Sequence, residues 1–238
     1  MAKYILADSD NRTRRGDYIF PSGSSFSSQS SSNIVSENAS EIAATPLVAI
    51  MLNPWHAQLD NPKMLKMHFT TELDDTNDPI FRTNVCEVPM PEATTDQKII
   101  FALLVIKQVY KNTEFNQWAE KWITGSDRGA ASAGKLIACL GRLAKDTHGA
   151  TESLAAMGVR DTEIENFCGL NNDFSARASE AIFAAQMYVD RADNWPLLAS
   201  RSVCSAVAGL DSRVDFDAIA EQAINASSNT VMRTRAAA

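Results

Sequence analysis

Residues 89–110 read PMPEATTDQKIIFALLVIKQVY, and this stretch divides the chain into two parts of different character. The prolines at its start end a preceding strand, because proline has no backbone N–H to donate to a sheet. Thr94, followed three residues later by Gln97, forms a capping box, the reciprocal side-chain pattern that begins a helix. The sequence therefore predicts a helix over 95–111 and a domain boundary just before it.

On the N-terminal side of this boundary, residues 1–92 are predicted to form a small β-rich region. Residues 65–73, LKMHFTTEL, alternate apolar and polar side chains, and this period of two is typical of a half-buried strand. After the turn sequence DDTNDP, residues 81–88 are expected to form a second, antiparallel strand. The short apolar stretches KYIL (3–6) and DYIF (17–20) are expected to be strands around a polar turn.

Two other segments of this region have their own compositions. Residues 45–52 begin with Thr45 and Pro46, which suit the N-cap and the first helical position, so a short helix is predicted. The serine-rich run at 22–32 cannot form a core and is predicted to be a surface loop. His68 falls on the polar face of its strand, where it is expected to be solvated.

Beyond the boundary, residues 93–230 are predicted to form a helical domain, followed by a tail over 231–238. Alanine, the best helix former, is frequent from residue 130 onward. The fold class is predicted as α+β, a small antiparallel β region followed by a mainly α-helical bundle or α-hairpin array. The expected helices cover 95–111, 114–124, 128–145, 150–157, 161–168, 174–192, 196–209 and 215–227.

Residues 118–128, WAEKWITGSDR, place two tryptophans one helical turn apart. Trp118 and Trp122 share one face of a helix, and we expect that face to pack against a neighbouring helix. An exposed aromatic shelf for a ligand is the alternative. Gly125 is expected to take the left-handed conformation that ends the helix.

The residues after Gly125 have structural explanations as well. Ser126 or Asp127 can cap the next helix with a side-chain oxygen. Arg128 can lie over an indole ring or pair with Asp127. The stretch is therefore interpreted as a corner between two helices, anchored by tryptophan.

No constellation for catalysis stands out in the sequence. The patterns of a nucleophile elbow, a phosphate-binding loop and an HExxH zinc motif are missing. The four cysteines lie far apart without histidine partners, so we expect buried free thiols and no metal site. No catalytic residue, cofactor or metal ligand is expected. Trp55 and His56, in NPWHA, either close the edge of the small sheet or line a pocket.

The composition narrows the classes of partner. A net charge of −7 gives no positive field for phosphate backbones, so nucleic acid is not expected as a partner. The longest apolar run, IIFALLVI, is well short of the roughly 18 residues of a membrane span. No signal peptide is apparent. We expect a cytosolic location, or release into a bacterial cytoplasm if the gene is viral.

Taken together, the segments resemble a group of uncharacterised bacteriophage and prophage proteins, in which a small β region leads into an alanine-rich helical domain. Related helical domains of this kind are labelled immunity proteins in bacteria. The resemblance covers roughly residues 45–145, and the chain departs from the group in its serine-rich loop and in lacking a long Ala/Tyr repeat. The matching positions are Pro91, Thr94, Gln97, Trp118, Trp122, Gly125, Asp127 and Arg128.

This resemblance implies a phage setting and a fold, and no reaction. We expect the protein to act by protein–protein interaction without catalysis, in host takeover, immunity or counter-defence. A virion or assembly component, and an enzyme with a small-ligand pocket near Trp55 and His56, are the alternatives. The candidate interaction surface comprises Trp55, His56, Trp118, Trp122, Asp127 and Arg128. A host or phage protein is the expected partner, and a homo-oligomer is left open.

Overall fold

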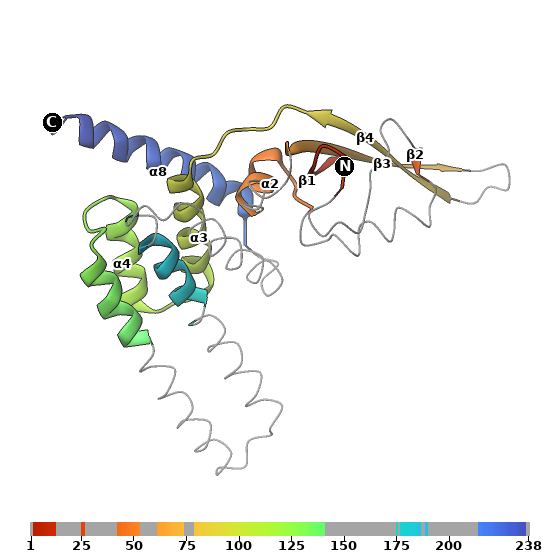
Figure 1. The fold of residues 1–238 in the computed structure, drawn as a ribbon. Coiled ribbons are helices and arrows are strands. Elements are labelled where there is room, and N and C mark those ends of the chain that lie inside the picture. The colour runs from red at the N-terminus through yellow and green to blue at the C-terminus, as the bar shows by residue number, and fades with distance from the viewer. Residues whose placement is uncertain are drawn as a thin grey trace, which may run out of the picture. The chain divides into compact units, whose positions relative to one another are not determined.

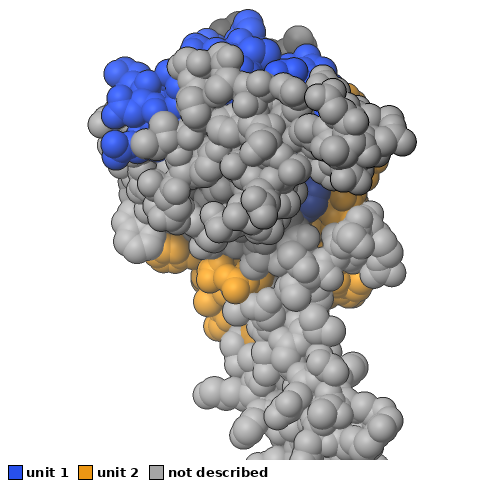
Figure 2. Space-filling view, turned by 90° about the vertical axis from the view of Figure 1, so that its right-hand side faces the viewer, with its two compact units in different colours: residues 1–93, 216–220 blue, residues 94–215, 221–238 orange. Residues whose placement is uncertain are grey.

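The computed structural model describes residues 2–12, 25–26, 42–52, 61–73, 79–140, 175, 177–186, 189 and 214–236. The chain divides into two compact units (Figures 1 and 2). The first unit consists of residues 1–93 and 216–220, and the second of residues 94–215 and 221–238. The architecture is α+β, as predicted, with an antiparallel sheet near the N-terminus and helices in the C-terminal part.

The first unit contains a four-stranded sheet in the order β1-β3-β4-β2. Its strands are β1 (Ala2–Ala7), β2 (Ser25–Phe26), β3 (Lys63–Leu73) and β4 (Pro79–Val88). All three pairings are antiparallel, and Leu65 of β3 lies between Ile5 of β1 and Glu87 of β4. The predicted strand pair 65–73 and 81–88 is therefore confirmed. KYIL lies in β1 and pairs with β3, whereas DYIF lies outside the described residues.

One face of this sheet forms a small apolar core. Ile5, Ala7, Leu65 and Met67 are buried together, and Val85 of β4 packs against them. Because side chains alternate along a strand, the neighbouring Cys86 faces the other side and is an exposed free thiol. Burial was expected for the cysteines, and at Cys86 that expectation is wrong. His68 is exposed, as expected.

The predicted short helix of the first unit is α2 (Pro46–Leu52). The hydroxyl of Thr45 accepts a hydrogen bond from the Val48 N–H at 3.3 Å, as expected of an N-cap. The same hydroxyl donates to the carboxylate of Asp217 at 2.7 Å. This bond joins α2 to the first turn of α8 (Phe216–Ala236).

The second unit begins with α3 (Thr95–Val109), and its capping box is formed as predicted. The Gln97 N–H donates to the Thr94 hydroxyl at 3.2 Å, and the Thr94 N–H donates to the Gln97 amide oxygen at 2.7 Å. Residues 99–106 are all buried. A helix that is apolar on every side is typical of the centre of a domain, so α3 is the core helix of this unit.

The next helix, α4 (Thr113–Ile123), packs against α3 (Figure 1). The Asn112 side chain caps it by accepting from the Phe115 N–H at 2.8 Å. An ion pair between Lys107 of α3 and Glu120 of α4 adds to the contact. Residues 130–140 form a further helix, here named helix 130–140, and residues 175, 177–186 and 189 are also helical.

At the C-terminus, α8 extends to Ala236. The expected helix end near residue 227 is therefore wrong, whereas the tail from 231 stays a prediction. The Ser and Asn residues near this position lower helix propensity by only a fraction of a kcal/mol each, and no Gly or Pro interrupts the helix. The predicted helices 150–157, 161–168 and 196–209 lie outside the described residues. Within the described part of the chain, no helix has the length and apolar character to cross a bilayer.

Candidate functional site

The two tryptophans of α4 are both buried. Trp122 is 1% exposed and Trp118 is 6% exposed, so the expected packing is confirmed and the alternative of an exposed aromatic shelf is wrong. Trp118 continues a short series of aromatic contacts. The ring centroids of Trp118 and Phe115 are 6.4 Å apart, and those of Phe115 and Tyr110 are 5.8 Å apart.

The turn after α4 is a Schellman motif. Gly125 has a φ of 75°, the left-handed conformation that was expected. The Gly125 N–H donates to the Trp122 carbonyl at 3.1 Å, and the Ser126 N–H donates to the Lys121 carbonyl at 2.8 Å. These two bonds satisfy two of the carbonyls at the helix end that have no partner within the helix. The chain is thereby turned toward helix 130–140.

Asp127 holds the start of that next helix. One of its carboxylate oxygens accepts from the Gly129 N–H at 2.9 Å and from the Ser132 hydroxyl at 3.1 Å. These hydrogen bonds, the backbone one first, and the charge of Lys121 lower the pKa of Asp127. Asp127 thus bonds to Gly129, just before the helix, and to the side chain of Ser132, and not to a backbone N–H of the helix as a cap would. Its carboxylate stays charged near neutral pH.

Arg128 fixes the corner between α3 and α4. Its guanidinium carbon lies 4.1 Å from the centre of the Trp122 ring, which confirms the expectation that Arg128 can lie over an indole ring. Its Nε donates to the Trp122 carbonyl at 2.9 Å, and its Nη1 lies 2.7 Å from a carboxylate oxygen of Asp96. The ion-pair partner is thus Asp96 in the first turn of α3, and the expected pairing with Asp127 is wrong. Asp127 is instead turned toward Gly129 and Ser132.

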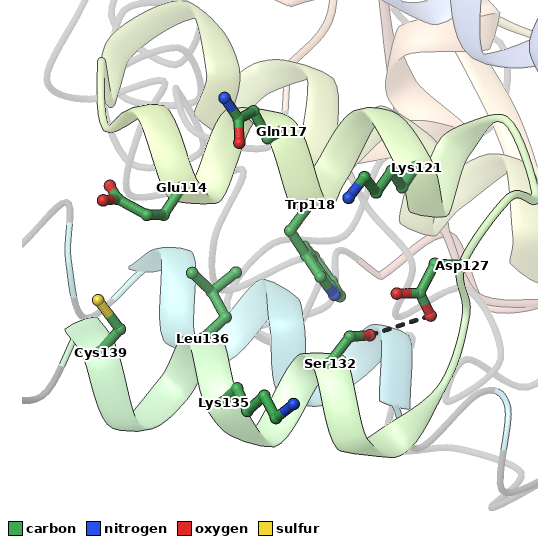
Figure 3. Close-up of a pocket in the computed structure, with 9 residues that line it drawn as sticks. All are labelled: Glu114, Gln117, Trp118, Lys121, Asp127, Ser132, Lys135, Leu136 and Cys139. Atoms are coloured by element: carbon green, nitrogen blue, oxygen red, sulfur yellow. Dashed lines mark hydrogen bonds between the residues drawn. The ribbon is translucent and has the colours of Figure 1, made fainter.

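Between α4 and helix 130–140 lies a pocket of about 310 Å³ (Figure 3). We refer to it as the Trp118 pocket. Trp118 and Leu136 contribute apolar surface, and charged side chains of both signs stand around it. Its lining residues are Glu114, Gln117, Trp118, Lys121, Asp127, Ser132, Lys135, Leu136 and Cys139.

Each wall of the pocket follows the helical repeat. Positions 114, 117, 118 and 121 of α4 are spaced i, i+3, i+4, i+7, and so are positions 132, 135, 136 and 139 of the facing helix. Residues at these spacings share one face of a helix. The second set was missed in the sequence, although its spacing was visible there, because spacing alone does not tell which face of one helix meets which face of another.

A buried polar atom of the pocket lacks a partner among the described residues. The indole nitrogen of Trp118 is buried and makes no hydrogen bond within the described part of the chain. Figure 3 shows this indole standing in the gap between the two helices, with its nitrogen on the side of Asp127 and Ser132. An indole nitrogen can only donate, so an acceptor from outside would satisfy it.

Sequence reasoning also missed Lys98 of α3. It is 2% exposed, and burial lowers its pKa from 10.5 to about 8. The signal in the sequence was its position directly before the apolar run IIFALLVI, inside the helix that the capping box begins. Lys98 does not line the Trp118 pocket.

The structure brings together only some of the predicted site residues. Trp118 and Asp127 meet in the pocket, while Trp122 and Arg128 form the packed corner beside it. Trp55, His56 and the serine-rich loop, apart from β2, lie outside the described residues, so expectations about them stay predictions. Among the residues that the structure describes, no group of three or more His, Cys, Asp or Glu side chains could hold a metal ion.

Comparison with known proteins adds no assignment. No family model, no curated protein and no solved structure matches this chain. The resemblance to phage and prophage proteins therefore stays an expectation drawn from sequence motifs.

Proposed function

We propose that this protein acts by binding another protein, without catalysis, in the cytoplasm of a bacterium that carries the phage or prophage. The finer role would be host takeover, immunity or counter-defence. The Trp118 pocket carries the proposal, because it combines a central tryptophan with a surrounding ring of polar and charged side chains. Residues that dominate binding energy at protein interfaces are enriched in tryptophan and lie inside such a polar rim.

The charges around the pocket support a polar, specific contact. Glu114, Lys121, Asp127 and Lys135 supply two charges of each sign, so a partner must match a pattern and not merely a net charge. Charge complementarity of this kind selects partners and fixes the register of binding. Glu114, Lys121 and Lys135 are exposed and thus open to a partner.

Site-specific photo-crosslinking in the host bacterium tests this proposal. A photoreactive amino acid at Gln117, an exposed pocket residue, should give a discrete crosslinked product. The same amino acid at Gln108, an exposed glutamine on α3, is the matched control. The identity of the crosslinked protein separates a host target from a virion component.

The expected pattern is specific to the pocket. Crosslinking from position 117 should be lost when Lys121 and Lys135 are both changed to glutamate, because a partner matched to two lysines would then meet two acids. Equal crosslinking from positions 117 and 108, or no product from either, would contradict the proposal.

A further inference from the structure

The Trp118 pocket offers a hydrogen-bond donor that nothing in the described chain uses. Trp118 is more than nine-tenths buried, and its indole nitrogen has no hydrogen-bond partner among these residues. Nearly all buried polar groups in native proteins are paired. The group that binds here should therefore present an acceptor.

Because each wall of the pocket carries a lysine, we expect the acceptor to be an anion. Lys121 comes from α4 and Lys135 from helix 130–140, and both are exposed. Lys121 is near enough to Asp127 for its charge to act on that carboxylate. Lys135 has no ion pair within the described ranges, so its positive charge is the one left to attract a ligand.

Asp127, the pocket carboxylate near Lys121, already accepts hydrogen bonds from its own turn. Asp127 accepts from the Gly129 N–H and the Ser132 hydroxyl with one and the same oxygen, and it makes no hydrogen bond to the Trp118 indole nitrogen. Glu114 is seven residues before Lys121 on α4, about 10 Å along the helix axis at a rise of about 1.5 Å per residue. An anion would therefore bind near Lys121 and Lys135, whose two positive charges exceed the one negative charge of Asp127, and would be repelled from the Glu114 end.

The apolar surface and the volume of the Trp118 pocket limit the kind of group to which the anion can be attached. Trp118 and Leu136 are buried apolar residues that line the space. The volume of about 310 Å³ is at the low end of the range of about 300–1,000 Å³ for ligand pockets. It suits a short apolar arm better than a nucleotide.

We infer that the Trp118 pocket takes a carboxylate on a short apolar arm from the protein partner, accepting a hydrogen bond from the Trp118 indole nitrogen and pairing with Lys135. This inference rests on the proposed protein-binding function, since it names the group that the partner presents. The carboxylate belongs to an acidic side chain or to the C-terminus of the partner chain. Both sources share the chemistry that the pocket recognises.

Nuclear magnetic resonance of the indole N–H groups tests the inference on the full chain. The protein has four tryptophans, so a ¹⁵N-labelled sample gives few indole signals, and Trp118→Phe identifies the one from Trp118. The first probe is phenylacetate, with phenylacetamide as its neutral match. Fragments of this size bind with dissociation constants on the order of millimolar.

Phenylacetate should shift the Trp118 signal saturably and bind about fivefold more tightly than phenylacetamide, the effect of one charge pair near a protein surface. Lys135→Gln should remove that preference for the anion, and Glu114→Gln should leave it in place or raise it. Acetylglutamate amide, which carries only a side-chain carboxylate, and acetylleucine, which carries only a terminal one, then distinguish the two sources.

The inference is overturned if no carboxylate moves the Trp118 signal, if the amide binds as well as the acid, or if Lys135→Gln changes nothing. This result differs from failure of the proposed function. If position 117 crosslinks but no carboxylate binds, the proposed protein partner is supported and the inferred carboxylate is refuted. Carboxylate binding without any crosslink supports the chemistry of the pocket and refutes the protein partner.

Discussion

Changing Arg128 to methionine should destabilise the second unit more than any other single change to the corner between α3 and α4. The guanidinium makes three contacts: an ion pair with Asp96 at 2.7 Å, a hydrogen bond to the Trp122 carbonyl at 2.9 Å and a stack on the Trp122 ring at 4.1 Å. Methionine keeps much of the apolar stem and removes all three.

The size of the effect follows from the exposure of the groups. The Arg128 and Asp96 side chains are 22% and 13% exposed, so the pair lies between a surface pair, worth up to about 1 kcal/mol, and a buried one, whose disruption costs about 3–5 kcal/mol. The charged hydrogen bond contributes about 1.5–3 kcal/mol, and the ring contact about 0.5–2 kcal/mol. The buried Nη2 makes no hydrogen bond to a described residue, which offsets part of this.

Because contacts of one side chain do not add fully, we expect a loss of about 3 kcal/mol in the free energy of unfolding. Urea unfolding followed by tryptophan fluorescence and circular dichroism gives the value. Asp96→Asn alone should cost about 1–2 kcal/mol, and the double-mutant cycle should give a coupling of about 1 kcal/mol. Arg12→Met, at an exposed arginine of the first unit, is the matched control. A loss below about 0.5 kcal/mol for Arg128→Met, or no coupling to Asp96, would refute the reasoning.

Three further changes test other parts of the structure. Thr94→Ala removes the hydroxyl that accepts from Gln97 and should lower the free energy of unfolding by about 1 kcal/mol, measured in urea; no loss would mean that the capping box is not stabilising. Gly125→Ala forces a side chain into a φ of 75° and should cost about 1–2 kcal/mol, and a lower melting temperature would show it. For Lys98, burial lowers the pKa from 10.5 to about 8, so the folded chain releases this proton before the unfolded chain does. The free energy of unfolding should therefore rise between about pH 8 and 10.5, by up to about 3 kcal/mol, in the native protein and not in Lys98→Met. Equal pH profiles for the two proteins would contradict the burial of a charged Lys98.

Features set by neighbouring residues could be predicted from the sequence. The capping box of Thr94 and Gln97, the left-handed Gly125 and the alternation along β3 each depend on side chains a few positions apart. The burial of Trp118 and Trp122 followed from their spacing of one turn, because an apolar face of a helix must pack against something.

Features that join distant parts of the chain could not be predicted in this way. Arg128 and Asp96 are 32 residues apart, and only the packing of α4 on α3 brings them together. The partner of β1 was not evident either, because an apolar strand such as KYIL does not specify which edge it joins. The Trp118 pocket needs two helix faces in contact. The helical spacing of its second wall could be seen in the sequence, but not the face of α4 that this wall meets.

The assignment of residues 216–220 to the first unit affects how this protein matures during translation. A ribosome releases residues 1–93 long before it reaches Phe216, so the hydrogen bond between Thr45 and Asp217 must wait for the rest of the chain. Contacts between such distant parts of a chain form late in folding. A nonsense codon anywhere before position 217 would therefore impair the N-terminal half as well as the C-terminal one.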